Sequence, residues 1–366
     1  MAKPRLVAAV LALSAAIAAM GVEQRHDFTT TSTAAAPRAY VVGKTGLVQV
    51  VDTRTGTVLA HADTAGRATG VAVSPDGQRV YVVNGWTGSI TEVDPITGAV
   101  IGRIFTQVQL SQAAMRPDGK RLYVSASGGV AVVDPEHFRL VAAVKVAGQP
   151  QGLAVHPNNQ ILYVANAQDG TVGLVDTATA FQTSTVQVGG LPQHLAISPD
   201  GKRLYVSSMR LGEQTPGTLS VIDTTTNQVV GSLSVGRGAG SVAVTPDGST
   251  VYLALPKESS VAVIDAATMT LRERLPIDSP SVAIAPGDPR VFLATGPTTT
   301  VLDSSNAVLA TFRMKSVDLR ETRPRQFDAA IIAFPRVSRP RPARAPGRRS
   351  RRRPARREAR GVPGSA

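Results

Sequence analysis

Seven aspartates recur along the chain at nearly equal intervals, and carboxylates in such an array could serve acid–base catalysis or bind a cation. Successive members are 42, 40, 42, 47, 42 and 38 residues apart. Each ends an apolar alternation and opens a turn-like sequence, in which an Asp carboxylate accepts hydrogen bonds from the backbone ahead of it. The pattern therefore predicts one turn-forming aspartate per repeat instead of a catalytic array. The seven are Asp52, Asp94, Asp134, Asp176, Asp223, Asp265 and Asp303.

Among the other residues, His194 is the best candidate for a general base, because an unperturbed imidazole titrates near pH 6.5. No acidic partner for it is evident in the sequence, and the remaining four His residues share no ligand spacing with it. The chain contains no G-x-S-x-G elbow, H-E-x-x-H pair or P-loop, and Gly236-Arg237-Gly238-Ala239-Gly240 opens no predicted helix. We therefore assign no catalytic residue, metal ligand or cofactor.

The elements that would position these residues are short β-strands. Each repeat begins a strand with an aromatic residue, turns at Pro-Asp-Gly or a variant, and contains four apolar runs separated by turns. A period near forty residues suits one four-stranded antiparallel blade, so residues 39–320 are predicted to form an all-β, seven-bladed β-propeller. The aromatic residues are predicted to pack in its core and are Tyr40, Tyr81, Tyr123, Tyr163, Tyr205, Tyr252 and Phe292.

Three strings, YVVN at 81–84, YVAN at 163–166 and YVSS at 205–208, follow Pro-Asp-Gly-like turns and precede VxVxD-like endings. With these motifs the chain resembles the YVTN-type β-propeller repeat family over about residues 39–312. The resemblance implies a seven-bladed propeller on an exported or cell-surface protein, and implies little about its ligand. A WD40 propeller is disfavoured, because Trp86 is not followed by Asp and no Gly-His dipeptide marks a blade.

The first repeat lacks an inner strand before Tyr40, so a later segment must close the ring. Residues 314–320, which follow the seventh repeat, are the predicted closing strand. Their match is imperfect, because Asp318 and Arg320 interrupt the apolar alternation.

In a propeller, the loops between the second and third strands and those between blades share one face, on which variable loops are expected to carry function. Aligning the repeats places neutral polar residues at the mouth of the central channel on this face. They are Gln112, Gly152, His194, Ser241 and Ser281, preceded by Ser111, Gln151 and Gln193. Such a ring predicts a binding surface and disfavours a calcium-type or zinc-type site.

Two loops on the same face are further candidates. Residues 209–216 form the longest insertion and contribute Arg210 and Glu213, while Trp86 occupies the equivalent loop of the second repeat. A Trp in this loop suits contact with a protein or a sugar, and the alternative is a Trp that folds over its own loop. Arg237 is also a candidate binding residue, because the connector at residues 236–240 that contains it reaches this face.

The two ends of the chain differ from the repeats. Residues 1–20 combine Lys3 and Arg5 with an apolar run and a small-residue cleavage site, which predicts a signal peptide or an uncleaved anchor. Residues 21–38 form a linker. Because the chain has no Cys, neither a disulfide framework nor a lipidated Cys is expected.

Residues 321–366 are predicted to be a disordered tail. Residues 336–360 hold twelve Arg and one acid, so the rest of the chain carries a net charge of only +2. The tail could bind nucleic acid or another anionic polymer, or it could be the product of a shifted reading frame. Its densest basic clusters are Arg348, Arg349, Arg351, Arg352 and Arg353.

Together these features predict a monomeric, secreted or cell-surface binding module for a protein or a cell-envelope polymer, without evident catalysis. A lactonase-like hydrolase at the channel mouth is the first alternative. Binding of an anionic polymer by the tail is the second.

Overall fold

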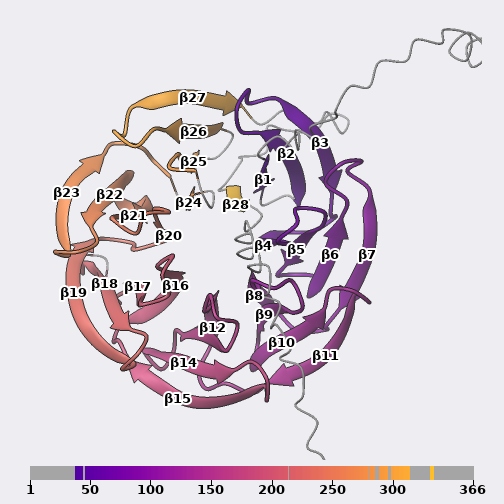
Figure 1. Cartoon of the computed structure of the whole chain (residues 1–366), viewed down its shortest axis with the longest axis horizontal. Helices are drawn as coiled ribbons and strands as arrows, with labels where there is room; N and C mark the ends of the chain where they lie inside the picture. Colours follow the sequence, from indigo (N-terminus) through magenta and orange to yellow (C-terminus); the bar gives the residue numbers. More distant parts are fainter. Residues whose placement is uncertain are drawn as a thin grey trace, which may run out of the picture. The chain divides into compact units, whose positions relative to one another are not determined.

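A computed structural model describes residues 38–43, 46–212, 214–279, 281–284, 288–295, 298–313 and 330–333. These residues form seven separate four-stranded antiparallel sheets, which follow one another around a ring (Figure 1). The prediction of an all-β, seven-bladed β-propeller is therefore confirmed. The predicted signal segment, the linker up to residue 37, and the arginine clusters lie outside the described residues.

Each blade has an inner, a second, a third and an outer strand. The inner strands are β28 (Ala330–Ala333), β4 (Ala68–Val73), β8 (Leu110–Met115), β12 (Pro150–Val155), β16 (Leu191–Ile197), β20 (Val242–Val244) and β24 (Ser281–Ile284). The second strands are β1 (Arg38–Gly43), β5 (Val80–Asn84), β9 (Leu122–Ala126), β13 (Ile161–Asn166), β17 (Arg203–Met209), β21 (Thr250–Leu255) and β25 (Val291–Thr295).

The third and outer strands complete the blades, and the 3-10 helix η1 (Pro256–Glu258) connects β21 to β22. The third strands are β2 (Leu47–Asp52), β6 (Ser89–Val93), β10 (Gly129–Asp134), β14 (Thr171–Asp176), β18 (Gly217–Asp223), β22 (Ser260–Asp265) and β26 (Thr298–Leu302). The outer strands are β3 (Val58–Asp63), β7 (Val100–Phe105), β11 (Arg139–Val144), β15 (Phe181–Gln187), β19 (Gln228–Gly236), β23 (Thr270–Leu275) and β27 (Val308–Arg313).

The hydrophobic core lies between neighbouring blades. One cluster, for example, joins Tyr40 and Val50 of the first blade to Val71 and Val82 of the second. All seven repeat aromatics are at most 2% exposed, which confirms that they pack in this core. A blade therefore obtains its burial from its neighbours, as expected for a repeat architecture.

The closing strand differs from the prediction. β28 pairs antiparallel with β1, with Tyr40 opposite Ala333 and Gly43 opposite Ala330. The predicted position at residues 314–320 was therefore wrong, and the propeller extends beyond its predicted end at residue 320. The physical reason is that Ala330 to Ala333 is an uninterrupted apolar run, which suits an inner strand, whereas residues 314–320 contain charged residues.

No helix in the described part of the chain has the length and apolar character needed to span a membrane.

Candidate functional site

The two faces of the propeller are defined by their connections. The turn face carries the inner-to-second and third-to-outer turns, and the loop face carries the second-to-third and outer-to-inner loops. On the turn face, each of the seven repeat aspartates accepts a hydrogen bond from the backbone N–H two residues ahead, as with Asp94 Oδ1 and Ile96 N at 2.7 Å. Backbone N–H donors stabilise the ionised carboxylate and so lower the pKa of these aspartates, chiefly from Ile96 at Asp94, and chiefly from the residue three positions ahead, Thr179 or Thr226, at Asp176 and Asp223. The turn-forming interpretation is confirmed.

On the loop face, the structure brings two of the predicted residues together at the channel mouth. The Gln112 side-chain Nε2 donates to His194 Nδ1 at 2.9 Å, although Gln112 belongs to β8 and His194 to β16. Between them lies β12, whose residue at this position is Gly152. A Cβ there would lie 2.6 Å from the Gln193 carbonyl oxygen and 2.9 Å from His194 Cα. Glycine therefore allows β12 and β16 to approach each other closely at this position.

The neighbouring polar position forms a second link. The Ser111 hydroxyl donates to Gln151 Oε1 at 2.9 Å, joining β8 to β12. Gln193 instead donates to the Leu191 carbonyl oxygen on its own strand at 3.4 Å. All of these side chains are partly exposed, so the mouth offers uncharged hydrogen-bonding groups to solvent.

Burial in the mouth lowers the pKa of His194 to about 4, because desolvation disfavours the imidazolium form. The Gln112 amide donates to Nδ1, so the proton of the neutral ring lies on Nε2. His194 therefore presents a neutral N–H donor at physiological pH.

A pH dependence of stability follows from this shift. As the pH falls below 6.5, His194 becomes protonated in the unfolded chain, whereas in the folded chain it stays neutral until about pH 4. The free energy of unfolding therefore decreases as the pH decreases. From pH 7 to pH 5 the loss is about 2 kcal/mol. Urea unfolding at both pH values should show a smaller loss for His194→Gln, whereas His61→Gln, on the exposed surface of β3, should retain the wild-type loss. Equal pH dependence of wild type and His194→Gln would contradict this expectation.

Beyond the mouth, the channel encloses about 320 Å³. Among the residues whose side chains are described, its walls come from six inner strands, mainly from the halves nearer the turn face, and these side chains are apolar, as at Val73, Ala114 and Ile197. None of the residues lining this space is Asp, Glu, Lys, Arg or His. The described channel therefore contains no acid that could pair with His194 for catalysis.

Trp86 is the most prominent aromatic residue of the loop face. It lies in the loop between β5 and β6 and is 73% exposed, while the Arg67 guanidinium lies 5.1 Å from its ring centroid. A backbone hydrogen bond from Gly85 N to the Arg67 carbonyl oxygen, 3.0 Å long, ties the two loops together. Arg67 could not be recognised from sequence spacing, because only the packing of two loops places it over the ring.

The insertion between β17 and β18 is exposed at Arg210 and at Leu211, whose side chain is 82% exposed. Glu213 lies outside the described residues. The backbone N of Arg237 donates to Glu258 Oε1 at 2.7 Å, and the Arg237 side-chain Nε lies 4.0 Å from the same oxygen. Arg274 pairs with Glu258 Oε2 at 2.7 Å. Two arginines thus share one acid, which sequence spacing did not indicate.

Two other features resemble sites. Ligand atoms of Asp134, Glu136 and His137 lie within 4.8 Å of one another on an exposed third-to-outer turn, where the Asp134 carboxylate already accepts hydrogen bonds within the turn.

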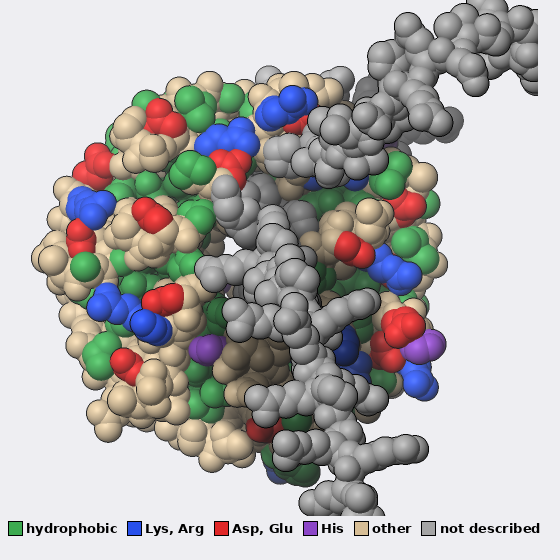
Figure 2. Space-filling view, viewed as in Figure 1, with side chains coloured by type: hydrophobic (Ala, Val, Ile, Leu, Met, Phe, Trp, Pro, Cys, Tyr) green, Lys and Arg blue, Asp and Glu red, His purple; other side chains and the backbone are tan. Residues whose placement is uncertain are grey.

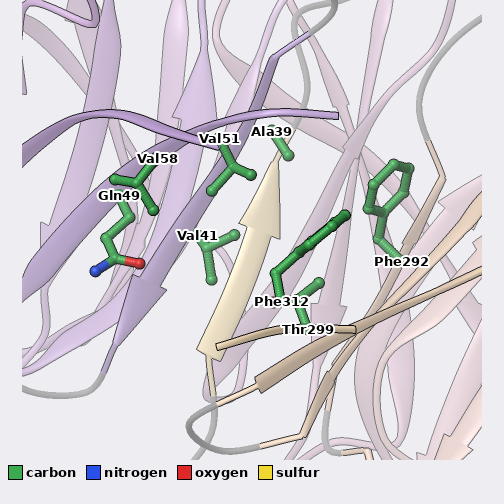
Figure 3. A pocket seen from close by; sticks show the side chains of 8 residues that line it. All are labelled: Ala39, Val41, Gln49, Val51, Val58, Phe292, Thr299 and Phe312. Atoms are coloured by element: carbon green, nitrogen blue, oxygen red, sulfur yellow. The ribbon is translucent and has the colours of Figure 1, made fainter. Parts of the chain in front are cut away.

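Between the first and seventh blades, a cavity of about 10 Å³ has room for about one water molecule. Figure 3 shows its lining side chains, with Phe292 and Phe312 opposite Val41 and Val51. This cavity belongs to the packing between the two blades.

Known proteins similar to this chain were found through structure alone, since no family model and no curated protein matches it. Hydrazine synthase from Kuenenia stuttgartiensis is 23% identical with a TM-score of 0.61, covering 67% of this chain and 86% of that one. A functionally unknown protein from Desulfotomaculum acetoxidans is 15% identical with a TM-score of 0.66, and the match covers 82% of this chain and 100% of that one. The β-propeller domain of Myceliophteria thermophila Cps50 (Swd1) is 11% identical with a TM-score of 0.62, and the match covers 71% of this chain and 90% of that one.

At these identities the likeness shows the fold. The chain is a seven-bladed β-propeller.

Proposed function

We propose that this protein is an exported or cell-surface binding module of the YVTN-repeat type, which recognises a protein or a cell-envelope polymer through its loop face. The observation that carries the proposal is Trp86, 73% exposed between two loops that are joined by a backbone hydrogen bond. An exposed aromatic side chain is typical of the anchors that dominate binding energy at interfaces.

The chemistry of the channel supports binding over catalysis. His194 is the one ionisable side chain in the seven inner strands, and it is held neutral beside an amide. A general base works best with a pKa near the working pH, and the pKa of His194 is well below it. Export is supported by the basic and apolar residues at positions 1–20.

The charge distribution of the body also supports this proposal over binding of an anionic polymer by the propeller itself. In the part of one face that Figure 2 draws in colour, basic and acidic side chains are intermixed, without a continuous patch of either sign. Binding of an anionic polymer would thus depend on the arginine clusters beyond residue 335, and it would weaken steeply as salt increases.

Binding by the full chain to solubilised cell-envelope polymers, measured by biolayer interferometry, tests the proposal. Trp86→Ala is expected to weaken binding at least tenfold, or about 1.4 kcal/mol, because the anchor side chain is lost. Phe181→Ala is the matched control, since Phe181 is also 73% exposed but begins β15 beside the turn face. Equal effects of the two substitutions would contradict a loop-face site.

Two further experiments distinguish loop-face binding from binding by the tail and from hydrolysis at the channel mouth. A chain ending at Pro335 should bind like the full chain, and binding that requires residues 336–366 and fades with salt would instead assign function to the tail. Lactone hydrolysis that disappears in His194→Gln would assign a hydrolase to the mouth.

A further inference from the structure

We propose that the channel mouth binds a neutral polyhydroxylated ligand, namely a sugar unit of a glycan. This inference rests on the proposed binding function and specifies its ligand. Its first basis is the composition of the inner strands. None of the seven contains Asp, Glu, Lys or Arg. A charged ligand would lose hydration at the mouth without gaining a counter-charge, which costs several kcal/mol. Neutral ligands avoid this cost.

The second basis is the orientation of the polar groups. The hydrogen bond from Gln112 leaves the His194 Nε2–H and the Gln112 Oε1 for a ligand, as one donor and one acceptor. The bond from Ser111 occupies Gln151 Oε1 and leaves the Gln151 amide N–H groups as donors. Both links thus fix side chains before a ligand arrives, which lowers the ordering cost of binding.

The third basis is the class of ligand that matches the hydrogen-bonding groups of the channel mouth. A sugar hydroxyl both donates and accepts, so it matches a mouth where donors and acceptors lie side by side. A peptide would need apolar pockets for its side chains. The mouth positions in the described blades two to seven are instead Gly, Ser, Gln, His and Thr, with Thr69 beside Gly70 in the second blade. Polyol recognition is therefore favoured over peptide recognition.

The same two links also hold inner strands together, so a structural role must be separated from recognition. Isothermal titration calorimetry on the full chain at pH 7.5 makes this separation, with cellotetraose, maltotetraose and chitotetraose as neutral probes. The cationic, deacetylated form of chitotetraose and tetragalacturonate serve as charged probes. At least one neutral probe should bind, and the charged probes should bind at least tenfold more weakly.

Gln112→Leu and Gln151→Leu should each weaken binding of that neutral probe at least tenfold while the melting temperature stays close to wild type. Gln78→Leu, an exposed substitution on the turn face, should leave affinity unchanged. A direct readout is the ¹⁵N spectrum of the His194 ring, which should report an Nε2–H tautomer whose signal shifts on addition of the probe. If one glutamine variant unfolds, the other still decides the outcome.

Absence of binding by all neutral probes would overturn the proposal, as would equal or tighter binding of the charged forms, or wild-type affinity in both glutamine variants. Binding of envelope polymers that depends on Trp86 would survive any of these results. The proposed function and this inference therefore fail separately.

Discussion

A chain ending at Asp328 is expected to melt roughly 5 °C below the full-length protein, whereas a chain ending at Pro335 should melt like the full chain. The shorter chain lacks β28, so β1 loses its inner partner along the register from Tyr40 to Gly43. Each backbone hydrogen bond contributes about 1 kcal/mol, so the loss is on the order of 3 kcal/mol, which shifts the melting temperature of a domain of this size by about 5 °C.

Thermal unfolding followed by circular dichroism, with size-exclusion chromatography, measures this effect. The uncovered edge of β1 should also make the shorter chain associate, because an unpaired strand edge is a template for pairing. An unchanged melting temperature for the chain ending at Asp328 would show that the ring does not depend on β28. Equal loss in both truncated chains would assign the effect to the residues after Pro335.

Gly56→Ala is expected to destabilise the protein by about 3 kcal/mol. Gly56 has φ of +71°, and a Cβ at this position would lie 1.9 Å from the Phe312 ring, on the outer strand of the seventh blade. The left-handed backbone costs an alanine about 1 kcal/mol, and the collision adds roughly 2 kcal/mol. The substitution thus strains the contact between the first and last blades.

Gly128→Ala provides the control for backbone strain alone. Gly128 has φ of +87°, and a Cβ there would meet nothing within 4 Å, so a loss of only about 1 kcal/mol is expected. Urea unfolding of both variants gives the comparison. Phe312→Ala should relieve most of the extra cost of Gly56→Ala in the double variant, and strictly additive losses would contradict the contact.

Much of the fold was predictable because its signals are local. Asp94 and the four residues after it form a turn through their own backbone bonds, and the same arrangement recurs in every blade. Tyr81 and its equivalents begin strands that are buried wherever blades pack. The membership of the candidate site was also partly predictable, since the repeat alignment assigned Gln112 and His194 to equivalent positions.

What the sequence determined by itself was thus the repeating unit, the number of blades and the neutrality of the inner strands other than the closing one, since each depends on residues close in the chain. Tertiary structure alone decided which segment closes the ring, and it placed Arg67 over Trp86 and Glu258 between two arginines. It also joined Gln112 to His194 across Gly152. These contacts link residues on different strands or blades, and their partners become neighbours only when the blades pack into a closed ring.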